Sequence, residues 1–410
     1  MPQPLITVCI PTRERAETLA HTLRTLTSQN YPDCEFLVSD NASGDATEAV
    51  ASTTNDPRVR YVRLPARGSM SSNFDFALSH SRGKYVSFLG DDDGFTPGSL
   101  EYLSKLCERH APDAISWSEG SFRWPGVEAD GPAQRLFFGG DIFRIRTDAI
   151  RPLWQLGIFR WGYCPIVYGG LVRTEVLNSL KGKDNRFFQS EIPDVYSTAM
   201  LMKNLKEYIY TNYSISVFGY SKKSNAASYF SRQINNAGDA LQKFESEFER
   251  PPHPKFSAAA LKSDHAAIYE CLLRVNGLNH HESSLWFDAF WHLRIARSLN
   301  KREEPYRSHA LEELSRSAYS PYLKALVKFY PRAKAAPADS PPKAKRGEES
   351  PYRTIYEVCK AAGAFYGAQG ARLGLEPTRE VSTIFDAISF RNFVLARKVT
   401  TDLSLPQDSR

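Results

Sequence analysis

The chain has 410 residues, more than one ordinary hydrophobic core contains, so we expect a main domain and at least one smaller unit. Hydrophobic residues make up 42% and charged residues 24%, as in soluble globular proteins, and no apolar run approaches the roughly 18–20 residues that span a bilayer. The formal net charge of +6 is dispersed along the chain. It is too weak to indicate nucleic-acid binding and favours, at most, an anionic lipid or glycan as partner.

The N-terminal segment and the cysteines favour a cytoplasmic protein. Residues 1–13 lead directly into a predicted strand, without the basic region, apolar segment and cleavage site of a secretory leader. The six cysteines form no C-x-x-C pair and no Cys/His group at zinc-ligand spacing. We therefore expect reduced, mostly buried thiols and a cytoplasmic location, with the inner face of the membrane as an alternative.

Strand-like and helical patterns alternate from the start of the chain. The first helix carries Leu19, Leu23 and Leu26 on one face. Apolar runs predict strands at residues 5–10, 35–39, 59–64, 85–89 and 114–117, and helical spacing predicts further helices at 42–52, 71–81 and 99–109. This order predicts a mostly parallel sheet flanked by helices, in which ligands bind beyond the carboxyl ends of the strands.

The composition changes after this region, and the changes suggest domain boundaries. Residues 125–170 are aromatic and Gly-rich, which is typical of loops and short strands. The predicted organisation is a catalytic domain at 1–230, a helical region at 231–330, a flexible linker at 331–351 and a C-terminal helical segment at 352–410. The linker is rich in Pro, Ala and charge and has no large apolar residue with which to bury surface.

Three consecutive carboxylates, Asp91, Asp92 and Asp93, directly follow the strand predicted at 85–89. Neighbouring carboxylates raise one another's pKa unless a cation compensates them, and oxygen ligands favour Mg²⁺ or Mn²⁺. The alternative is a solvated acidic turn before the next helix. From these residues alone the two interpretations are evenly balanced.

Two further segments end predicted strands at the same sheet edge. Asp40 closes the second strand and is suited to accept hydrogen bonds from a base or a ribose, although a strand-to-helix turn also selects Asp, Asn and Gly. The segment 10–15 opens the first helix, where backbone donors and arginines face an anion. Taken singly, the segment around Asp40 favours a plain strand-to-helix turn, and segment 10–15 is only a weak indication of nucleotide binding.

Together the three segments resemble the inverting family-2 glycosyltransferases, which have the GT-A fold, a Rossmann-like mixed sheet flanked by helices. The matching features are a first strand ending in PTRER, a second ending in VSDNASGD, and GKYVSFLGDDDGFTPGSL at the place of the family's acidic metal motif. They occur in order over about residues 4–110. The resemblance implies an α/β GT-A domain followed by an α-helical C-terminal appendage.

The resemblance also implies roles for single residues. Pro11, Thr12 and Glu14 would lie near the nucleotide, Asp40 at its base, and the acidic cluster at the metal and diphosphate. Because Gly90 stands where the family's commonest motif begins with Asp, the register makes Asp92 the principal metal ligand, Asp91 a ligand near the ribose and Asp93 an auxiliary ligand. Many relatives carry an Arg-Asn pair on a following helix. Here Asn73 stands in that neighbourhood and would contact the donor without the arginine.

An inverting transfer requires a general base on the acceptor side. The segment 187–197 places Glu191 and Asp194 in a loop that leads into a predicted helix, as in capsule and O-antigen-type relatives. We expect Asp194 to be the base and Glu191 to be second to it. The alternative is that Asp194 is only the N-cap of that helix.

A last segment, 218–225, combines Gly, hydroxyl groups and two lysines after a strand-like run. Lys222 and Ser224 would bind the donor diphosphate, where the leaving group develops negative charge. A plain polar turn is the favoured alternative for either lysine taken singly.

The predicted function is metal-dependent inverting transfer of a sugar from a nucleotide-diphosphate donor of the UDP-sugar class. The acceptor is a glycan or lipid-linked glycan of a bacterial surface polysaccharide, and Mn²⁺ or Mg²⁺ is the cofactor. Peripheral membrane contact and a homo-oligomer through the C-terminal helices are further expectations. The alternatives are a non-catalytic scaffold on a degenerate GT-A fold, which would need no base, and a nucleotidyltransferase, for which a Gly-rich phosphate loop is missing after the first strand.

Overall fold

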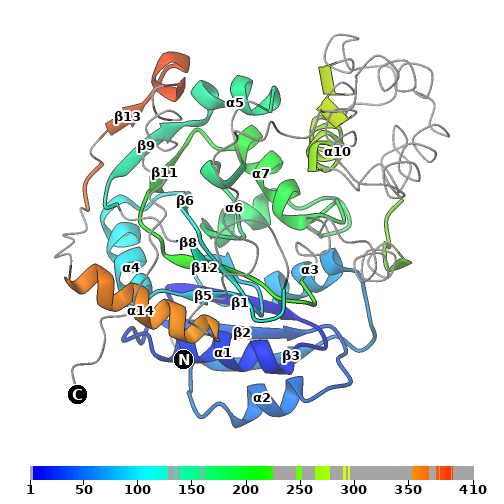
Figure 1. Ribbon diagram of the computed structural model, residues 1–410. Coiled ribbons are helices and arrows are strands. Elements are labelled where there is room, and N and C mark those ends of the chain that lie inside the picture. The colour runs from blue at the N-terminus through cyan, green and yellow to red at the C-terminus, as the bar shows by residue number, and fades with distance from the viewer. Residues whose placement is uncertain are drawn as a thin grey trace, which may run out of the picture.

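The computed structural model describes residues 3–127, 134–135, 139–157, 161–224, 246–251, 264–277, 290–291, 294–295, 353–368, 375–377, 379–388 and 390. Figure 1 shows an α/β architecture in which a large twisted sheet runs between layers of helices. The predicted linker at 331–351 lies outside the described residues, as does most of the helical region predicted at 231–330.

Within the described residues, the large sheet has nine strands in the order β13-β9-β11-β6-β10-β4-β1-β2-β3. Their bounds are β1 Ile6–Thr12, β2 Cys34–Asp40, β3 Val59–Arg63, β4 Tyr85–Phe88, β6 Ala114–Trp117, β9 Ile142–Arg146, β10 Gly170–Arg173, β11 Glu207–Thr211 and β13 Arg379–Val381. Strand β1 pairs in parallel with β2 and β4, and β2 with β3, whereas β10 runs antiparallel between β4 and β6. The predicted mixed, mostly parallel sheet is confirmed.

One face of the sheet packs on helices α1 (Ala16–Thr27), α4 (Ser99–His110) and α14 (Ile355–Ala368). Strand β1 points Ile6, Val8 and Ile10 into this core. The helices meet them with one apolar stripe each, formed by Leu19, Leu23, Leu26, Leu100, Leu103, Leu106, Ile355 and Val358. Side chains along a strand alternate between faces, so the same strands also supply the opposite core.

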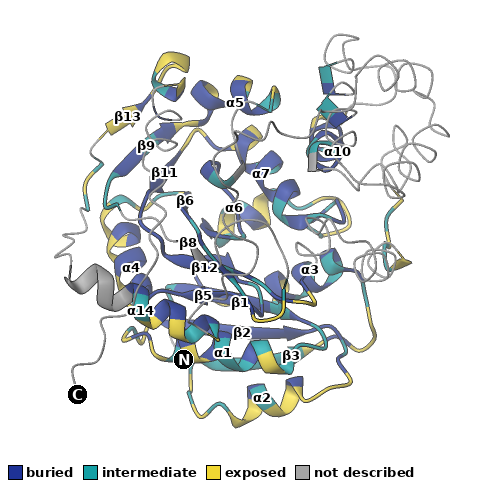
Figure 2. Ribbon diagram, in the orientation of Figure 1, coloured by how far each residue is buried: buried dark blue, intermediate teal, exposed yellow. Residues whose placement is uncertain are grey.

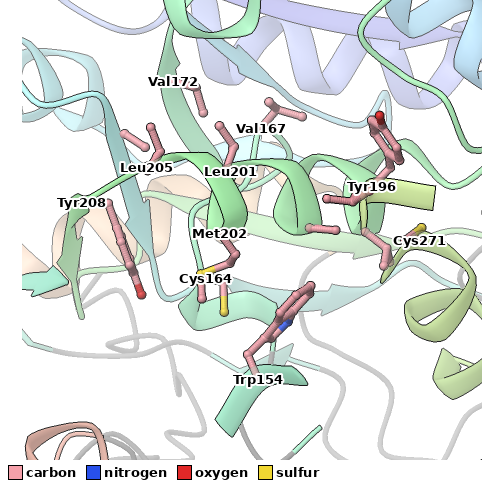
Figure 3. Packing of buried hydrophobic residues seen from close by; sticks show 14 of the residues in the cluster. Trp154, Cys164, Val167, Val172, Tyr196, Leu201, Met202, Leu205, Tyr208 and Cys271 are labelled. Carbon is pink, nitrogen blue, oxygen red and sulfur yellow. The ribbon is translucent and has the colours of Figure 1, made fainter. Parts of the chain in front are cut away.

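The other face packs on helices α3 (Met70–His80), α5 (Thr147–Gln155), α7 (Pro193–Asn204) and α10 (Asp264–Asn276). Helix α7 lies at the centre of this core, where Leu201 and Met202 pack with residues of the neighbouring strands and Tyr196 lies near Cys271 of α10 (Figure 3). Figure 2 shows the central strands as buried and the exposed residues on outer surfaces such as that of α2 (Thr47–Thr53).

A second sheet has four strands in the order β5-β12-β7-β8, and three of them directly follow strands of the large sheet in the chain. Its bounds are β5 Gly94–Phe95, β7 Gly120–Arg123, β8 Gln134–Arg135 and β12 Ser216–Tyr220. In chain order β4 is followed by β5, β6 by β7 and β11 by β12, so the chain passes from the large to the small sheet three times. The carboxyl ends of β4, β6 and β11 therefore meet the small sheet at one junction.

Helix α2 begins later than the predicted 42–52, because the turn before it is not helical. Ala42 has a positive φ of 52°, and the carboxylate of Asp45 accepts hydrogen bonds from Thr47 N and Ala16 N at 3.0 Å. These bonds fix the turn to the start of α1 and delay the helix to Thr47. The helices predicted at 71–81 and 99–109 are confirmed as α3 and α4 within one residue at each end.

The C-terminal segment predicted as helical contains a strand as well as helix α14. Strand β13 pairs in parallel with β9 at the edge of the large sheet, with Val381 opposite Ile145. Val381 is buried, while Arg379 and Glu380 are exposed. Strand β13 forms because the edge strand β9 offers unpaired backbone groups to a further strand. Its three residues are too few to show the alternation of apolar and polar residues by which a strand is predicted from the sequence.

Candidate functional site

The ends of β1 and β2 lie side by side, because Thr12 pairs with Asp40 in the parallel register. Asp40 is fully buried, and its carboxylate accepts hydrogen bonds from Tyr61 Oη at 2.6 Å, Ser43 N at 3.0 Å and Arg63 at 3.1 Å. Pro11 precedes Thr12 opposite Ser39. The first two predicted nucleotide segments therefore form one continuous edge.

Glu14 and Asn73 are each tied to the loop or strand that carries Asp40. Glu14 has a positive φ of 56°, and its carboxylate accepts from Gly44 N at 2.9 Å and pairs with Arg67 at 3.1 Å. Asn73 on α3 is bound twice to Ser39: its Oδ1 accepts from the hydroxyl at 2.7 Å and its Nδ2 donates to the carbonyl at 3.0 Å. Asn73 thus holds the residue directly before Asp40.

The acidic cluster, Asp91–Asp93, lies between β4 and β5, at the junction of the two sheets, and all three residues are buried. Asp91 accepts a hydrogen bond from Thr12 at 2.7 Å and one from Arg15 at 2.8 Å. Arg15 also lies 4.0 Å from Asp92 Oδ1. The cluster is thereby joined to the end of β1 and carries an internal cation.

Asp93 points to a different side from its two neighbours. Its Oδ1 accepts from Gly219 N at 2.6 Å, and its Oδ2 accepts from Gly90 N at 3.0 Å and Tyr168 Oη at 2.5 Å. A Cβ at Gly90 would lie 2.4 Å from the Tyr168 hydroxyl, so the position has no room for the Asp that the commonest family motif carries there. The departure at Gly90 is explained by the Tyr168–Asp93 hydrogen bond.

Burial and crowding change the ionisation of this cluster. Burial raises the pKa of Asp92 to about 6, against the opposing effects of Arg15 and the Ser221 hydrogen bonds. Burial and the charge of Asp92 raise the pKa of Asp93 well above its usual range. Burial alone would lower the pKa of Arg15, but the charges of Asp91 and Asp92 raise it. Arg15 therefore stays charged beside carboxylates that cost energy to ionise.

The loop after β12 closes against the cluster. Ser221 binds Asp92 Oδ2 through its hydroxyl at 2.6 Å and its backbone N at 3.3 Å. The backbone of Gly219 lies so close that a Cβ there would stand 1.8 Å from the carbonyl oxygen of Asp92. Lys223 donates to the carbonyl of Glu14 at 2.7 Å, and Arg15 donates to the carbonyl of Lys223.

Lys222 and Ser224 lie in the same loop but face differently. The Lys222 side chain lies over Gly126, where a Cβ would be 2.7 Å from Nζ. Ser224 is buried, and its backbone N donates to the carbonyl of Ser221 at 3.0 Å, which closes a tight turn. The structure thus brings this loop to Asp92 through Ser221, a residue that the sequence alone did not single out.

Asp194 and Glu191 lie at the start of α7. The N-cap of α7 is Ile192, Pro193 is its first residue, and Asp194 stands in the first turn, so Asp194 is not the N-cap. Glu191 Oε1 accepts backbone hydrogen bonds from Glu249 N at 3.1 Å and Arg250 N at 2.9 Å. Burial raises the pKa of Glu191.

A link between Asp194 and the acidic cluster runs through Glu119, a residue that the sequence did not bring forward. Glu119 lies between β6 and β7 at the sheet junction. Burial raises the pKa of Glu119, and the charge of Asp194 adds to the rise. Burial and the charge of Asp92 raise the pKa of Asp93, and the charge of Glu119 adds to that rise. Tyr168 and Glu119 carry no sequence signal beyond the neighbouring glycines at 120, 169 and 170.

The acidic cluster offers one carboxylate oxygen to a divalent cation. Among the described residues, no group of three or more His, Cys, Asp or Glu side chains is arranged to hold a metal ion. Asp91 and Asp93 use both of their oxygens in hydrogen bonds, whereas Asp92 Oδ1 has no hydrogen bond within the described part of the chain. One carboxylate oxygen fits a hard cation that takes its remaining ligands from phosphate and water.

The N-terminal part of the chain is similar to known proteins. Residues 7–129 match the model of glycosyl transferase family 2. A Campylobacter jejuni protein, GalNAc(5)-diNAcBac-PP-undecaprenol beta-1,3-glucosyltransferase, is 30% identical over 158 residues, which are 35% of this chain and 51% of that protein. The succinoglycan biosynthesis protein ExoO of Rhizobium meliloti is 25% identical over 142 residues, 35% of this chain and 39% of that protein.

Among solved structures, S. aureus TarS 1-349 in complex with UDP-GlcNAc is similar, with a TM-score of 0.44 and 15% identity over 79% of this chain and 90% of that one. The chain spans about half, or less, of the length of the two curated relatives. The matched region contains β1, β2, β4 and the acidic cluster, which are the elements that build the site.

Proposed function

We propose that the protein transfers a sugar from a nucleotide-diphosphate donor, of the UDP-sugar class, to a glycan acceptor with inversion of the anomeric centre, because residues 7–129 match the model of glycosyl transferase family 2. The observation that carries this proposal is the convergence of three segments on the acidic cluster. Thr12 reaches Asp91 at 2.7 Å and Ser221 reaches Asp92 at 2.6 Å. The junction of the two sheets thereby combines an acidic turn, the end of β1 and a loop that carries lysines.

The nucleotide binds along the ends of β1 and β2 in this proposal. Asp40 accepts hydrogen bonds from the base, with Pro11, Thr12 and Glu14 around the ribose. The three donors that already hold the Asp40 carboxylate fix its orientation before a ligand arrives. Asn73 acts here by fixing Ser39 rather than by touching the donor.

The diphosphate binds at the acidic cluster. Asp92 Oδ1, with Asp91 beside it, would hold a divalent cation, Mn²⁺ or Mg²⁺, which supplies positive charge to the leaving diphosphate when bound. Arg15 lies 2.8 Å from Asp91 and contributes a cation of the chain itself at the same place. Lys222 and Ser224 belong to the loop that closes over this end. Asp93 holds the loop through Gly219 N.

Asp194 is the proposed general base. It removes the proton of the acceptor hydroxyl while that oxygen attacks the anomeric carbon, and the bond to the diphosphate breaks on the opposite side. Asp194 is preferred to Glu191 because it stands in the first turn of α7 and its charge acts on Glu119, which lies at the sheet junction.

The acceptor class rests on the relatives. The name of the Campylobacter jejuni relative describes an undecaprenol-linked glycan, and we propose an acceptor of the same class, a glycan or lipid-linked glycan of a bacterial surface polysaccharide. In the described part of the chain, no helix combines the length and the apolar character needed to cross a bilayer. Contact with the inner membrane face is proposed for Ile384, Phe385 and Ile388, of which Phe385 is 77% exposed.

Thermal unfolding with ligands tests the central proposal. The protein, Asp92→Asn and the surface control Asp148→Asn are heated with UDP, GDP, ADP and CMP, each with and without Mn²⁺. A ligand that binds only the native state raises the unfolding temperature. We expect a Mn²⁺-dependent rise with UDP in the protein and the control, lost in Asp92→Asn. Absence of a rise with every nucleotide would contradict nucleotide-sugar transfer and favour a non-catalytic scaffold.

A further inference from the structure

Glu119 is held in a fixed orientation by a chain of two hydrogen bonds. Trp117 Nε1 donates to Ser216 Oγ at 2.8 Å, and Ser216 Oγ lies 3.0 Å from Glu119 Oε1. The Ser216 hydroxyl accepts from the indole N–H and donates its own proton to Glu119 Oε1. Glu119 Oε1 is therefore an acceptor, and any proton that the carboxyl binds is carried by Oε2.

The backbone is shaped to admit this carboxyl. Gly169 has a φ of 73°, and a Cβ at this position would lie 2.4 Å from the carboxyl carbon of Glu119. The preceding residue, Tyr168, donates its hydroxyl to Asp93 at 2.5 Å. Two neighbouring residues thus connect the two groups: Tyr168 contacts the acidic cluster and Gly169 lies against Glu119.

Two carboxylates and two hydroxyl groups face Glu119. They are Asp194 from α7, Asp93 of the acidic cluster, Ser216 from β12 and Tyr168. Burial raises the pKa of Glu119 to about 7, the Ser216 hydrogen bond opposes the rise, and the charge of Asp194 adds to it. Near neutral pH, Oε2 is therefore a hydrogen-bond donor in the protonated form of Glu119 and an acceptor in the ionised form.

We propose that Glu119 is a specificity-determining residue that binds a hydroxyl group of the sugar being transferred, through Oε2. A sugar hydroxyl both donates and accepts, which matches a carboxyl of this kind, whereas a phosphate would be repelled by the ionised form of Glu119 itself. The inference rests on the proposed sugar transfer and deepens it. It places the sugar between the acidic cluster, which holds the diphosphate, and Asp194, which approaches the anomeric carbon.

The test separates binding of the nucleotide from binding of the sugar. The protein, Glu119→Ala, Glu119→Gln and the exposed control Glu101→Gln are titrated by calorimetry with UDP and with UDP-glucose, UDP-galactose and UDP-N-acetylglucosamine in the presence of Mn²⁺. Loss of one hydrogen bond to a carboxyl weakens binding about tenfold. We expect Glu119→Ala to weaken the best UDP-sugar by about that factor while its affinity for UDP stays within about twofold of the unaltered protein.

The isosteric variant and pH complete the test. Glu119→Gln keeps one donor and one acceptor at every pH, so its UDP-sugar affinity should match the unaltered protein at pH 6 and lack its change between pH 6 and 8. Equal UDP-sugar affinities in the protein and Glu119→Ala, with UDP bound by both, would overturn the role of Glu119. Absence of binding of UDP and UDP-sugars to the unaltered protein would instead overturn the proposed function, and with it this inference.

Discussion

The guanidinium of Arg15 lies 2.8 Å from Asp91 Oδ1 and 4.0 Å from Asp92 Oδ1, so the acidic cluster contains its own counter-ion. Asp91 and Asp92 expose only 3% and 5% of their side-chain surface, and Arg15 exposes 18%. Removing one partner of a buried ion pair leaves the other charge uncompensated, which costs more than the pair contributes. The stability of the site therefore depends on Arg15 even without a ligand.

We predict that Arg15→Gln lowers the free energy of unfolding by about 3 kcal/mol and that Arg15→Gln with Asp91→Asn lowers it by less than the two single changes together. The measurement is urea unfolding of the four proteins at pH 7.5. The exposed pair Arg146 and Asp148 provides the matched control cycle, with a coupling energy below about 1 kcal/mol. Additivity of the Arg15 and Asp91 changes would contradict a direct interaction.

The backbone of Gly219 leads to a second prediction. A Cβ at this position would stand 1.8 Å from the carbonyl oxygen of Asp92, so Gly219→Ala forces the loop and the cluster apart. We expect Gly219→Ala to abolish nucleotide-dependent stabilisation in the thermal assay. Gly162→Ala is the control, because a Cβ at Gly162 meets no atom within 4 Å. Unchanged nucleotide binding by Gly219→Ala would show that the loop does not contribute to the site.

The sequence was sufficient to predict β1, β2, β3, β4 and β6 of the large sheet, because the central strands β1, β2 and β4 are buried and appear as largely apolar runs. It was also sufficient to place Thr12, Asp40 and Asp92 at one edge, since parallel strands end together. It did not predict β9, β10 and β11. Strand β13 escaped prediction because it exists through pairing with β9, a contact with no local signal.

The orientation of each carboxylate could not be predicted from the sequence. Asp91, Asp92 and Asp93 are adjacent, yet their partners come from Arg15, Ser221 and Tyr168, three segments far apart in the chain. As a result, both oxygens of Asp93 accept hydrogen bonds, whereas Asp92 Oδ1 has none within the described residues. A run of three acids carries no information about which oxygen the fold leaves available.

The two carboxylates at the start of α7 should differ in their effect on turnover. We predict that Asp194→Asn lowers kcat by about 10²–10⁴-fold while leaving nucleotide affinity unchanged, because a general base acts on the acceptor. Glu191→Gln keeps the Oε1 acceptor for Glu249 N and Arg250 N, so kcat should fall by less than about tenfold. The measurement is transfer of radiolabelled sugar from the nucleotide-sugar that binds best. A larger loss of kcat in Glu191→Gln than in Asp194→Asn would make Glu191 the general base instead of Asp194.

Asp75 gives the protein a stability that depends on pH. Its Oδ1 accepts from Phe187 N at 2.8 Å and Phe188 N at 3.2 Å, whereas its buried Oδ2 has no partner within the described residues. Burial raises the pKa of Asp75 from 3.8 to about 6, against the effect of the two backbone bonds. The folded state then binds the proton more tightly than the unfolded state, so stability is lost as the pH rises from about 4 to about 6.

We predict that Asp75→Asn removes this loss, because its carbonyl keeps the two backbone bonds without a charge. The unfolding free energy of Asp75→Asn minus that of the unaltered protein should rise by about 3 kcal/mol between pH 4 and pH 7 and be constant above, since one pKa unit is about 1.4 kcal/mol. Urea unfolding at several pH values measures this difference. The exposed control Asp148→Asn should show no rise over this interval, and a difference that stays constant for Asp75→Asn would mean that Asp75 ionises normally in the folded protein.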